Sequence, residues 1–103
     1  MSRRIRIEPE AEAELQAAAE WYETQQAGFG FELLSQAQAV YQRIAEGEHG
    51  ATVPGTQTGA RRVPVSRFPL WVVFVERSEE IVIIAYAHER RRPGYWLARV
   101  RKS

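Results

Sequence analysis

The chemically richest stretch of the sequence lies near its C-terminal end, where ionisable and aromatic residues follow an apolar run. Residues 81–87 are apolar, and the next nine residues read His88-Glu89-Arg90-Arg91-Arg92-Pro93-Gly94-Tyr95-Trp96. An imidazole transfers protons near neutral pH, guanidinium groups bind phosphates and carboxylates, and aromatic rings stack on bases. The stretch therefore suits contact with a nucleic acid or with an acidic partner. Whether it also catalyses a reaction is left open by these residues.

The charged residues are sorted along the chain, although the net charge is only +1. Residues 1–58 carry four arginines against nine glutamates, a net charge of −5. Residues 59–103 carry nine arginines and one lysine against four glutamates, a net charge of +6. A nucleic acid or an acidic partner would meet this cationic half. Genome composition explains the preference for arginine over lysine as well as a binding role does. It does not explain why the arginines cluster in one half of the chain.

Length and composition indicate one soluble domain, residues 1–103, with a single modest core. No stretch approaches the roughly 18 apolar residues needed to cross a bilayer, and the early arginines are not followed by the apolar region of a signal peptide. The chain has no cysteine, and its two histidines lie far apart, so no residues have metal-ligand spacing. We expect a cytoplasmic protein with no cofactor, no metal and no membrane association.

The N-terminal half has the pattern of a short strand followed by two helices. Residues 4–7 alternate between arginine and isoleucine, as in a half-buried strand. Pro9 suits the first position of a helix that runs to about Gln26, and the early glutamates favour the positive end of its dipole. After two glycines, a second helix carries apolar residues on one side and stops near Gly47. The short connection predicts an antiparallel helical hairpin.

The C-terminal half has the pattern of a long loop followed by three strands. The segment from Glu46 to Gly59 has four glycines and no periodicity, so we expect a mobile or functional loop. Arg61 to Arg67 alternates as a strand, in which Pro64 indicates an edge position or a bulge.

Two continuously apolar runs, residues 70–75 and 81–87, are joined by a short polar turn and are typical of central strands. The order β-α-α-β-β-β predicts an α+β fold, in which an antiparallel sheet packs against the N-terminal helical hairpin.

Four short motifs occur in an order that is similar to one superfamily of small bacterial proteins. They are Glu8-Pro9-Glu10-Ala11, Trp21-Tyr22-Glu23, Phe68-Pro69-Leu70 and His88…Arg91-Arg92-Pro93-Gly94-Tyr95-Trp96. Together they span nearly the whole chain and resemble the RelE/ParE superfamily, the toxins of type II toxin–antitoxin (plasmid stabilisation) modules. The resemblance implies a compact toxin that inhibits growth and is held inactive by an acidic antitoxin covering its surface.

The resemblance also implies one of two targets. ParE-like members poison DNA gyrase, whereas RelE-like members cleave mRNA in the ribosomal A site. Such a nuclease needs no metal, but it needs a group that takes the 2′-hydroxyl proton, cations near the phosphate and a proton donor for the leaving oxygen. The candidate catalytic residues are His88, Arg91 and Tyr95.

Two departures favour the ParE-like reading over the RelE-like one. RelE-like enzymes resemble one another in basic residues on the strand matching residues 61–65 and in an arginine on the next strand. Here Pro64 occupies one of the basic positions, and Trp71 stands about where the arginine is expected. The sequence therefore predicts a gyrase inhibitor, with a ribosome-dependent mRNA endonuclease (mRNA interferase) as the alternative.

A set of arginines forms the expected surface for the target or the antitoxin: Arg61, Arg62, Arg67, Arg90, Arg91, Arg92 and Arg99. Each aromatic or ionisable candidate also has a purely structural interpretation. His88 would cap its strand, Trp96 would belong to the core, and Trp21 and Tyr22 would hold the first helix against the sheet. The glutamates of the first helix would form a solvated face.

Overall fold

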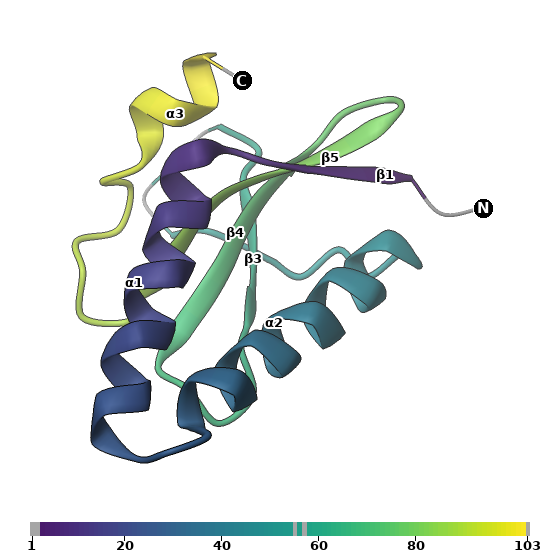
Figure 1. The fold of residues 1–103 in the computed structure, drawn as a ribbon. Coiled ribbons are helices and arrows are strands. Elements are labelled where there is room, and N and C mark those ends of the chain that lie inside the picture. The colour runs from purple at the N-terminus through teal and green to yellow at the C-terminus, as the bar shows by residue number, and fades with distance from the viewer. Residues whose placement is uncertain (1–2, 55, 57, 103) are drawn as a thin grey trace.

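A computed structural model describes residues 3–54, 56 and 58–102. In it, five strands form one sheet in the order β1-β5-β4-β3-β2, and a helical hairpin covers one face of that sheet (Figure 1). The elements are β1 (Arg4–Ile7), α1 (Pro9–Gln25), α2 (Phe29–Ala45), β2 (Ala51–Thr52), β3 (Arg61–Pro64), β4 (Leu70–Glu76), β5 (Glu80–His88) and α3 (Leu97–Lys102). The predicted α+β class, the helical hairpin and the relative order of the six predicted elements are confirmed, and β2 and α3 are additional. Among the described residues, no helix combines the length and apolar character that crossing a bilayer requires.

The sheet is buried on both faces, which explains why β4 and β5 are continuously apolar. On one face, side chains such as Val72, Phe74 and Ile83 pack against α1 and α2. On the other face, Val73 and Ile84 belong to a second cluster that includes Trp96. Trp96 is only 2% exposed, so its predicted place in the core is confirmed.

Strands β2 to β5 are antiparallel, as predicted, but β1 joins the edge of β5 in parallel, so the sheet is mixed and not wholly antiparallel as predicted. β1 pairs only with residues 80–83, so the rest of β5 extends beyond it. The register between β4 and β5 shifts by one residue at Ile84, because Val73 lies opposite Ala85 and Phe74 opposite Ile83. Such a bulge changes which backbone groups point out of the sheet edge. Both features shape the site described below.

Glu23 holds the connection between the two helices. Its carboxylate accepts hydrogen bonds from the backbone N–H groups of Gly28 (2.8 Å) and Gly30 (2.9 Å). Gly28 has φ 89°, a left-handed conformation that glycine adopts without strain. A Cβ atom on Gly30 would lie 2.5 Å from the carbonyl oxygen of Ala19, so the hairpin needs glycine there. These contacts bring α1 and α2 into close antiparallel packing.

The structure corrects the predicted course of the chain in three places. The predicted loop from Glu46 to Gly59 contains the short strand β2, which extends the sheet by pairing with β3; residues 55 and 57 of that loop lie outside the described residues. β3 ends at Pro64, short of the predicted Arg67, because the chain turns back there. The C-terminal helix α3 was not predicted, since six residues are too few to show a helical period.

Two predicted roles for residues of α1 are also wrong. Trp21 is 57% exposed, so it does not pack α1 onto the sheet. Tyr22 does so, as predicted, because it packs against the core and its ring lies 5.0 Å from that of Phe68 in the turn before β4. The glutamates of α1 do not all form a solvated face, since Glu14 and Glu23 are engaged in hydrogen bonds within the fold.

Candidate functional site

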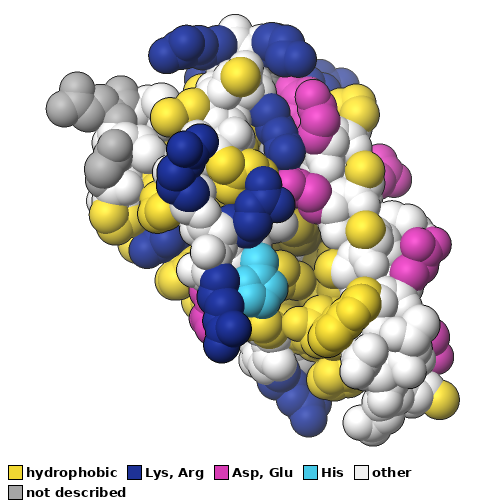
Figure 2. All heavy atoms as spheres, turned by 90° about the vertical axis from the view of Figure 1, so that its left-hand side faces the viewer, with side chains coloured by type: hydrophobic (Ala, Val, Ile, Leu, Met, Phe, Trp, Pro, Cys, Tyr) yellow, Lys and Arg dark blue, Asp and Glu magenta, His cyan; other side chains and the backbone are white. Residues whose placement is uncertain are grey.

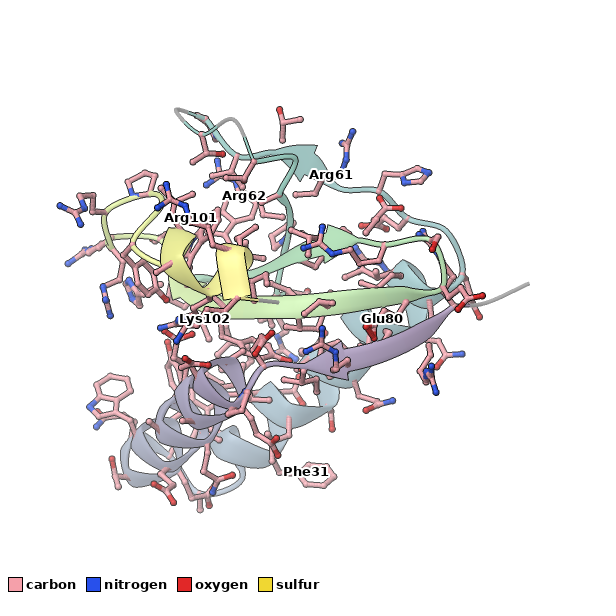
Figure 3. The ribbon with its side chains drawn as sticks, turned by 90° about the horizontal axis from the view of Figure 1, so that it is seen from above. Phe31, Arg61, Arg62, Glu80, Arg101 and Lys102 are labelled. Atoms are coloured by element: carbon pink, nitrogen blue, oxygen red, sulfur yellow. The ribbon has the colours of Figure 1, made fainter. Side chains whose placement is uncertain are left out.

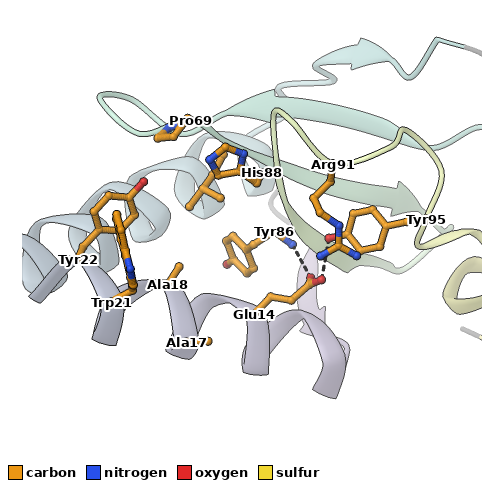
Figure 4. A pocket seen from close by; sticks show the side chains of 11 residues that line it. Glu14, Ala17, Ala18, Trp21, Tyr22, Pro69, Tyr86, His88, Arg91 and Tyr95 are labelled. Atoms are coloured by element: carbon orange, nitrogen blue, oxygen red, sulfur yellow. Dashed lines mark hydrogen bonds between the residues drawn. The ribbon is translucent and has the colours of Figure 1, made fainter. Parts of the chain in front are cut away.

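A cleft of about 590 Å³ opens between α1 and the C-terminal end of β5. Its walls are largely apolar, with a histidine, an arginine and a tyrosine at its margin (Figure 4). The lining residues are Glu14, Ala17, Ala18, Trp21, Tyr22, Pro69, Leu70, Tyr86, His88, Arg91 and Tyr95. From outside, the hollow is seen as an apolar surface with basic side chains gathered along one side (Figure 2). The three candidate catalytic residues therefore line one and the same cleft.

The turn after β5 fixes the positions of His88 and Arg91. The backbone N–H of Arg91 donates to the carbonyl oxygen of His88 at 2.9 Å. The imidazole Nδ1 of His88 accepts the backbone N–H of Arg90 at 3.1 Å. The guanidinium of Arg91 lies 3.9 Å from the centre of the Tyr95 ring, a cation–π contact. Arg91 is thus an exposed cation that is held over one end of the cleft.

Glu14 of α1 ties three segments together at the same end of the cleft. Its carboxylate accepts hydrogen bonds from the hydroxyl of Tyr95 (2.7 Å) and from two N–H groups of Arg99 (2.9 and 3.1 Å). It also accepts the backbone N–H of Tyr86 at 3.1 Å. Arg99 donates in addition to the carbonyl oxygen of Ile84 at 3.2 Å. Glu14 and Arg99 thereby satisfy edge groups of β5 that lie beyond the end of β1. The hydrogen bond between Glu14 and Tyr86 is drawn in Figure 4.

This arrangement alters the acid–base properties of Tyr95 and Arg99. Burial raises the pKa of Tyr95, and the hydrogen bond to the Glu14 carboxylate raises it further because it stabilises the protonated phenol. For Arg99, burial lowers the pKa, but the hydrogen bonds and the negative charge of Glu14 outweigh that effect and raise it overall. Tyr95 is therefore held as a neutral phenol, and Arg99 as a cation with its charge compensated inside the fold.

A second group of basic residues lies on the face of the sheet away from the helical hairpin. Arg61 and Arg62 of β3 are seen there in Figure 3. The guanidinium of Arg62 lies 4.0 Å from the centre of the Trp71 ring. Its Nε is buried and has no hydrogen-bond partner among the described residues. Arg62 also lines a small cleft of about 40 Å³ together with Arg91 and Arg92.

The predicted arginine surface is therefore divided in space. Arg90, Arg91 and Arg92 are exposed at the turn after β5, between the apolar cleft and the Arg62 side of the sheet. Arg67 lies apart from them, beside the connection of the helical hairpin, and pairs with Glu32 at 2.9 Å. Arg99 is turned inward to Glu14.

Glu14 is the part of the site that the sequence reasoning missed. A signal was available, because Glu14 follows the buried Ala11 by three residues and therefore shares its side of the helix. A carboxylate on the apolar side of a helix needs a partner within the fold. Its partners lie more than 70 residues away, at Tyr86, Tyr95 and Arg99, so the sequence does not reveal which residues they are.

The fold and the cleft define an α+β protein in which a helical hairpin and a basic C-terminal turn flank one edge of a mixed sheet. No family profile matches the sequence, and no curated protein matches it. Among solved structures, it is similar to a chain of the chromosomal ParDE TA system from P. aeruginosa. The TM-score is 0.69, with 19% identity, over 84% of this chain and 96% of that chain. The protein thus has the RelE/ParE-like fold that its motifs predicted.

Proposed function

We propose that this protein is the toxin of a type II toxin–antitoxin module, that an acidic antitoxin neutralises it, and that it inhibits DNA gyrase by binding. The fold supports the first part, because a chain of the chromosomal ParDE TA system from P. aeruginosa has the same one. The exposed guanidinium groups of Arg90, Arg91 and Arg92 support an acidic partner. The toxin would act in the cytoplasm, where it meets gyrase.

One observation favours binding over catalysis: the candidate acid–base groups already form hydrogen bonds within the fold. The hydroxyl of Tyr95 donates a hydrogen bond to Glu14. The pKa of Tyr95 is raised, so its phenol is a poor proton donor to a leaving oxygen. In neutral His88, the lone pair of Nδ1 accepts the N–H of Arg90, which leaves the proton on Nε2. A neutral imidazole in that form has no free lone pair with which to take the 2′-hydroxyl proton.

The cationic part of a nuclease site is also incomplete. Trp71 stands at the position on β4 where RelE-like enzymes are expected to have an arginine, and it contacts the guanidinium of Arg62. A binding toxin needs no such cation. It needs only an accessible charged and apolar surface, such as the basic turn beside the cleft.

The test is a gyrase supercoiling reaction with the purified protein. We expect loss of supercoiling and accumulation of cleaved DNA that remains bound to gyrase. On expression, growth should stop, and the acidic protein from a neighbouring reading frame should restore it. Normal supercoiling in the presence of folded protein would refute gyrase inhibition, and normal growth on expression would refute the assignment as a toxin.

The alternative is a RelE-like, ribosome-dependent mRNA endonuclease. It is favoured by one observation, namely that His88, Arg91 and Tyr95 line the same cleft. Codon-phased mRNA cuts in a translating extract, together with unaffected gyrase, would support this second function.

A further inference from the structure

The helical hairpin carries an apolar groove on the side that faces away from the sheet. Its volume is about 230 Å³, and it is lined by residues of both helices: Ala19, Glu20, Glu23, Gly30, Phe31 and Leu34. The side chain of Phe31 projects from the hairpin on the side opposite to Arg62 and Arg101 (Figure 3). Phe31 is 73% exposed and Leu34 is 42% exposed, so neither belongs to the core. The groove shares no lining residue with the cleft beside β5.

The floor of the groove is formed where the two helices touch. A Cβ atom on Gly30 would lie 2.5 Å from the carbonyl oxygen of Ala19, so the missing side chain lets the helices meet at this point. The Glu23 carboxylate fixes the start of α2 by accepting the N–H groups of Gly28 and Gly30. The groove is therefore preformed, and a partner that fills it does not have to order a loop first.

The charge around the groove is negative. Residues 9–45, which include both helices, carry six glutamates and one arginine, a net charge of −5. Three of these glutamates pair with basic side chains elsewhere in the fold, and the arginine pairs with Glu48. Glu20 and Glu23 line the groove, and neither forms an ion pair with a residue that the structure describes. Glu20 instead accepts a hydrogen bond from the neutral amide of Gln16 at 3.2 Å.

An apolar floor beside two carboxylates without a cation fits a basic and apolar protein surface. The carboxylates repel a nucleic acid, and they repel an acidic antitoxin in the same way. An arginine of the partner could lay its apolar stem on Phe31 and pair its guanidinium with Glu20. An enzyme that handles DNA carries arginine and lysine side chains on its own surface, because it must hold phosphate groups. The groove therefore complements the surface chemistry of such an enzyme.

We propose that the groove on the hairpin is a contact surface for gyrase, in which an apolar side chain of gyrase lies between Phe31 and Leu34 and a neighbouring basic side chain pairs with Glu20. The identity of the partner rests on the proposed function, because gyrase is the target named there. The groove adds a second contact to the basic turn after β5, and the two contacts carry opposite charges. Aromatic residues such as Phe31 are enriched where protein interfaces are fully buried.

The first test measures binding of the purified protein to immobilised, purified gyrase. Phe31→Ala should weaken binding about thirtyfold, the loss typical of a central residue of an interface. Glu20→Lys should weaken it at least as much, because it places a cation against the basic surface of the partner. Both side chains are exposed, so the variants should keep the circular dichroism spectrum of the wild type.

Two matched variants make this test specific to the groove. Glu12 and Gln38 are exposed on the same two helices but outside the groove. Glu12→Lys changes the charge as much as Glu20→Lys does, and it should leave gyrase binding unchanged, as should Gln38→Ala. Unchanged binding of the folded Phe31→Ala and Glu20→Lys proteins would overturn the proposal. An equal loss in Glu12→Lys would overturn it too, because net charge and not the groove would then determine binding.

The second test separates this inference from the proposed function. Expressed in bacterial cells, Phe31→Ala and Glu20→Lys should no longer stop growth, yet they should still co-purify with the acidic protein from the neighbouring reading frame. If the wild type stops growth and binds gyrase but both variants do so equally well, only the assignment of the groove is wrong.

Two other outcomes would also overturn the contact. If both variants lose the acidic protein together with their toxicity, the groove belongs to the surface that the antitoxin covers. If the wild-type protein does not bind gyrase, the proposed target is wrong, and the gyrase contact fails with it.

Discussion

Replacing Glu14 by alanine tests the most connected side chain of the site. The carboxylate accepts four hydrogen bonds, from Tyr86, Tyr95 and twice from Arg99. Breaking a buried ion pair by removing one partner costs about 3–5 kcal/mol, and a hydrogen bond to a charged group contributes about 1.5–3 kcal/mol. The side chains of Arg99 and Glu14 are 19% and 20% exposed, so water partly replaces the lost contacts. We therefore expect Glu14→Ala to lower the free energy of unfolding by about 3 kcal/mol.

The assay is equilibrium unfolding in urea, with Glu12→Ala as the matched control. Glu12 is exposed on the same helix, and its replacement should change stability by less than about 0.5 kcal/mol. For a domain of this size, the loss at Glu14 should lower the midpoint of thermal unfolding by about 12–24 °C. The loss of unfolding free energy in the double variant Glu14→Ala, Arg99→Ala should be smaller than the sum of the losses in the two single variants. Each single variant leaves the other charged group without its partner, which adds to its cost. A loss at Glu14 no larger than at Glu12 would refute the reasoning.

Three further predictions concern the core, the cleft and the helical connection. Trp96→Ala should cost about 3–5 kcal/mol in a urea titration, because the indole is 2% exposed; a cost below about 1 kcal/mol would contradict its place in the core. His88→Ala and Arg91→Ala should abolish growth arrest while the circular dichroism spectrum is unchanged, and folded variants that remain toxic would show that the site is wrongly assigned. The backbone hydrogen bonds from Gly28 and Gly30 lower the pKa of the Glu23 carboxyl in the folded state, so its stabilisation is complete above the unfolded value of about 4.3 and is lost as the pH falls. The difference in thermal midpoint between wild type and Glu23→Gln should therefore shrink as the pH falls from about 6 to about 3. A constant difference would contradict this.

The fold could be predicted from the sequence because its main signals are local. The helical period before Gly28 and the two unbroken apolar runs identify the hairpin and the central strands without any knowledge of tertiary contacts. The unpredicted elements have no such signal. β2 has two residues and forms only because β3 pairs with it. α3 has six residues, of which Leu97 and Val100 pack against the cluster that contains Trp96. Their conformations are determined by tertiary contacts.

The site was predicted as a set of residues but not as an arrangement. His88, Arg91 and Tyr95 were identified because their side chains are chemically distinctive and lie within eight positions of one another. Nothing in that spacing indicates that Glu14, more than 80 positions before Tyr95, accepts a hydrogen bond from the Tyr95 hydroxyl. Likewise, Arg99 has the same side chain as Arg91, yet it is compensated by Glu14 whereas Arg91 is exposed. The direction in which each arginine points depends on tertiary packing.

The cleft itself originates in a difference of length between two paired strands. β1 has four residues and β5 has nine. Pro9 begins α1 two residues after β1 ends, and a proline cannot donate a backbone hydrogen bond to a neighbouring strand. The chain therefore leaves the sheet while β5 continues, and the bulge at Ile84 turns the groups of Tyr86 and His88 toward the space that β1 would have filled. Glu14 and Arg99 satisfy the first part of that edge, and the remainder is the open part of the cleft.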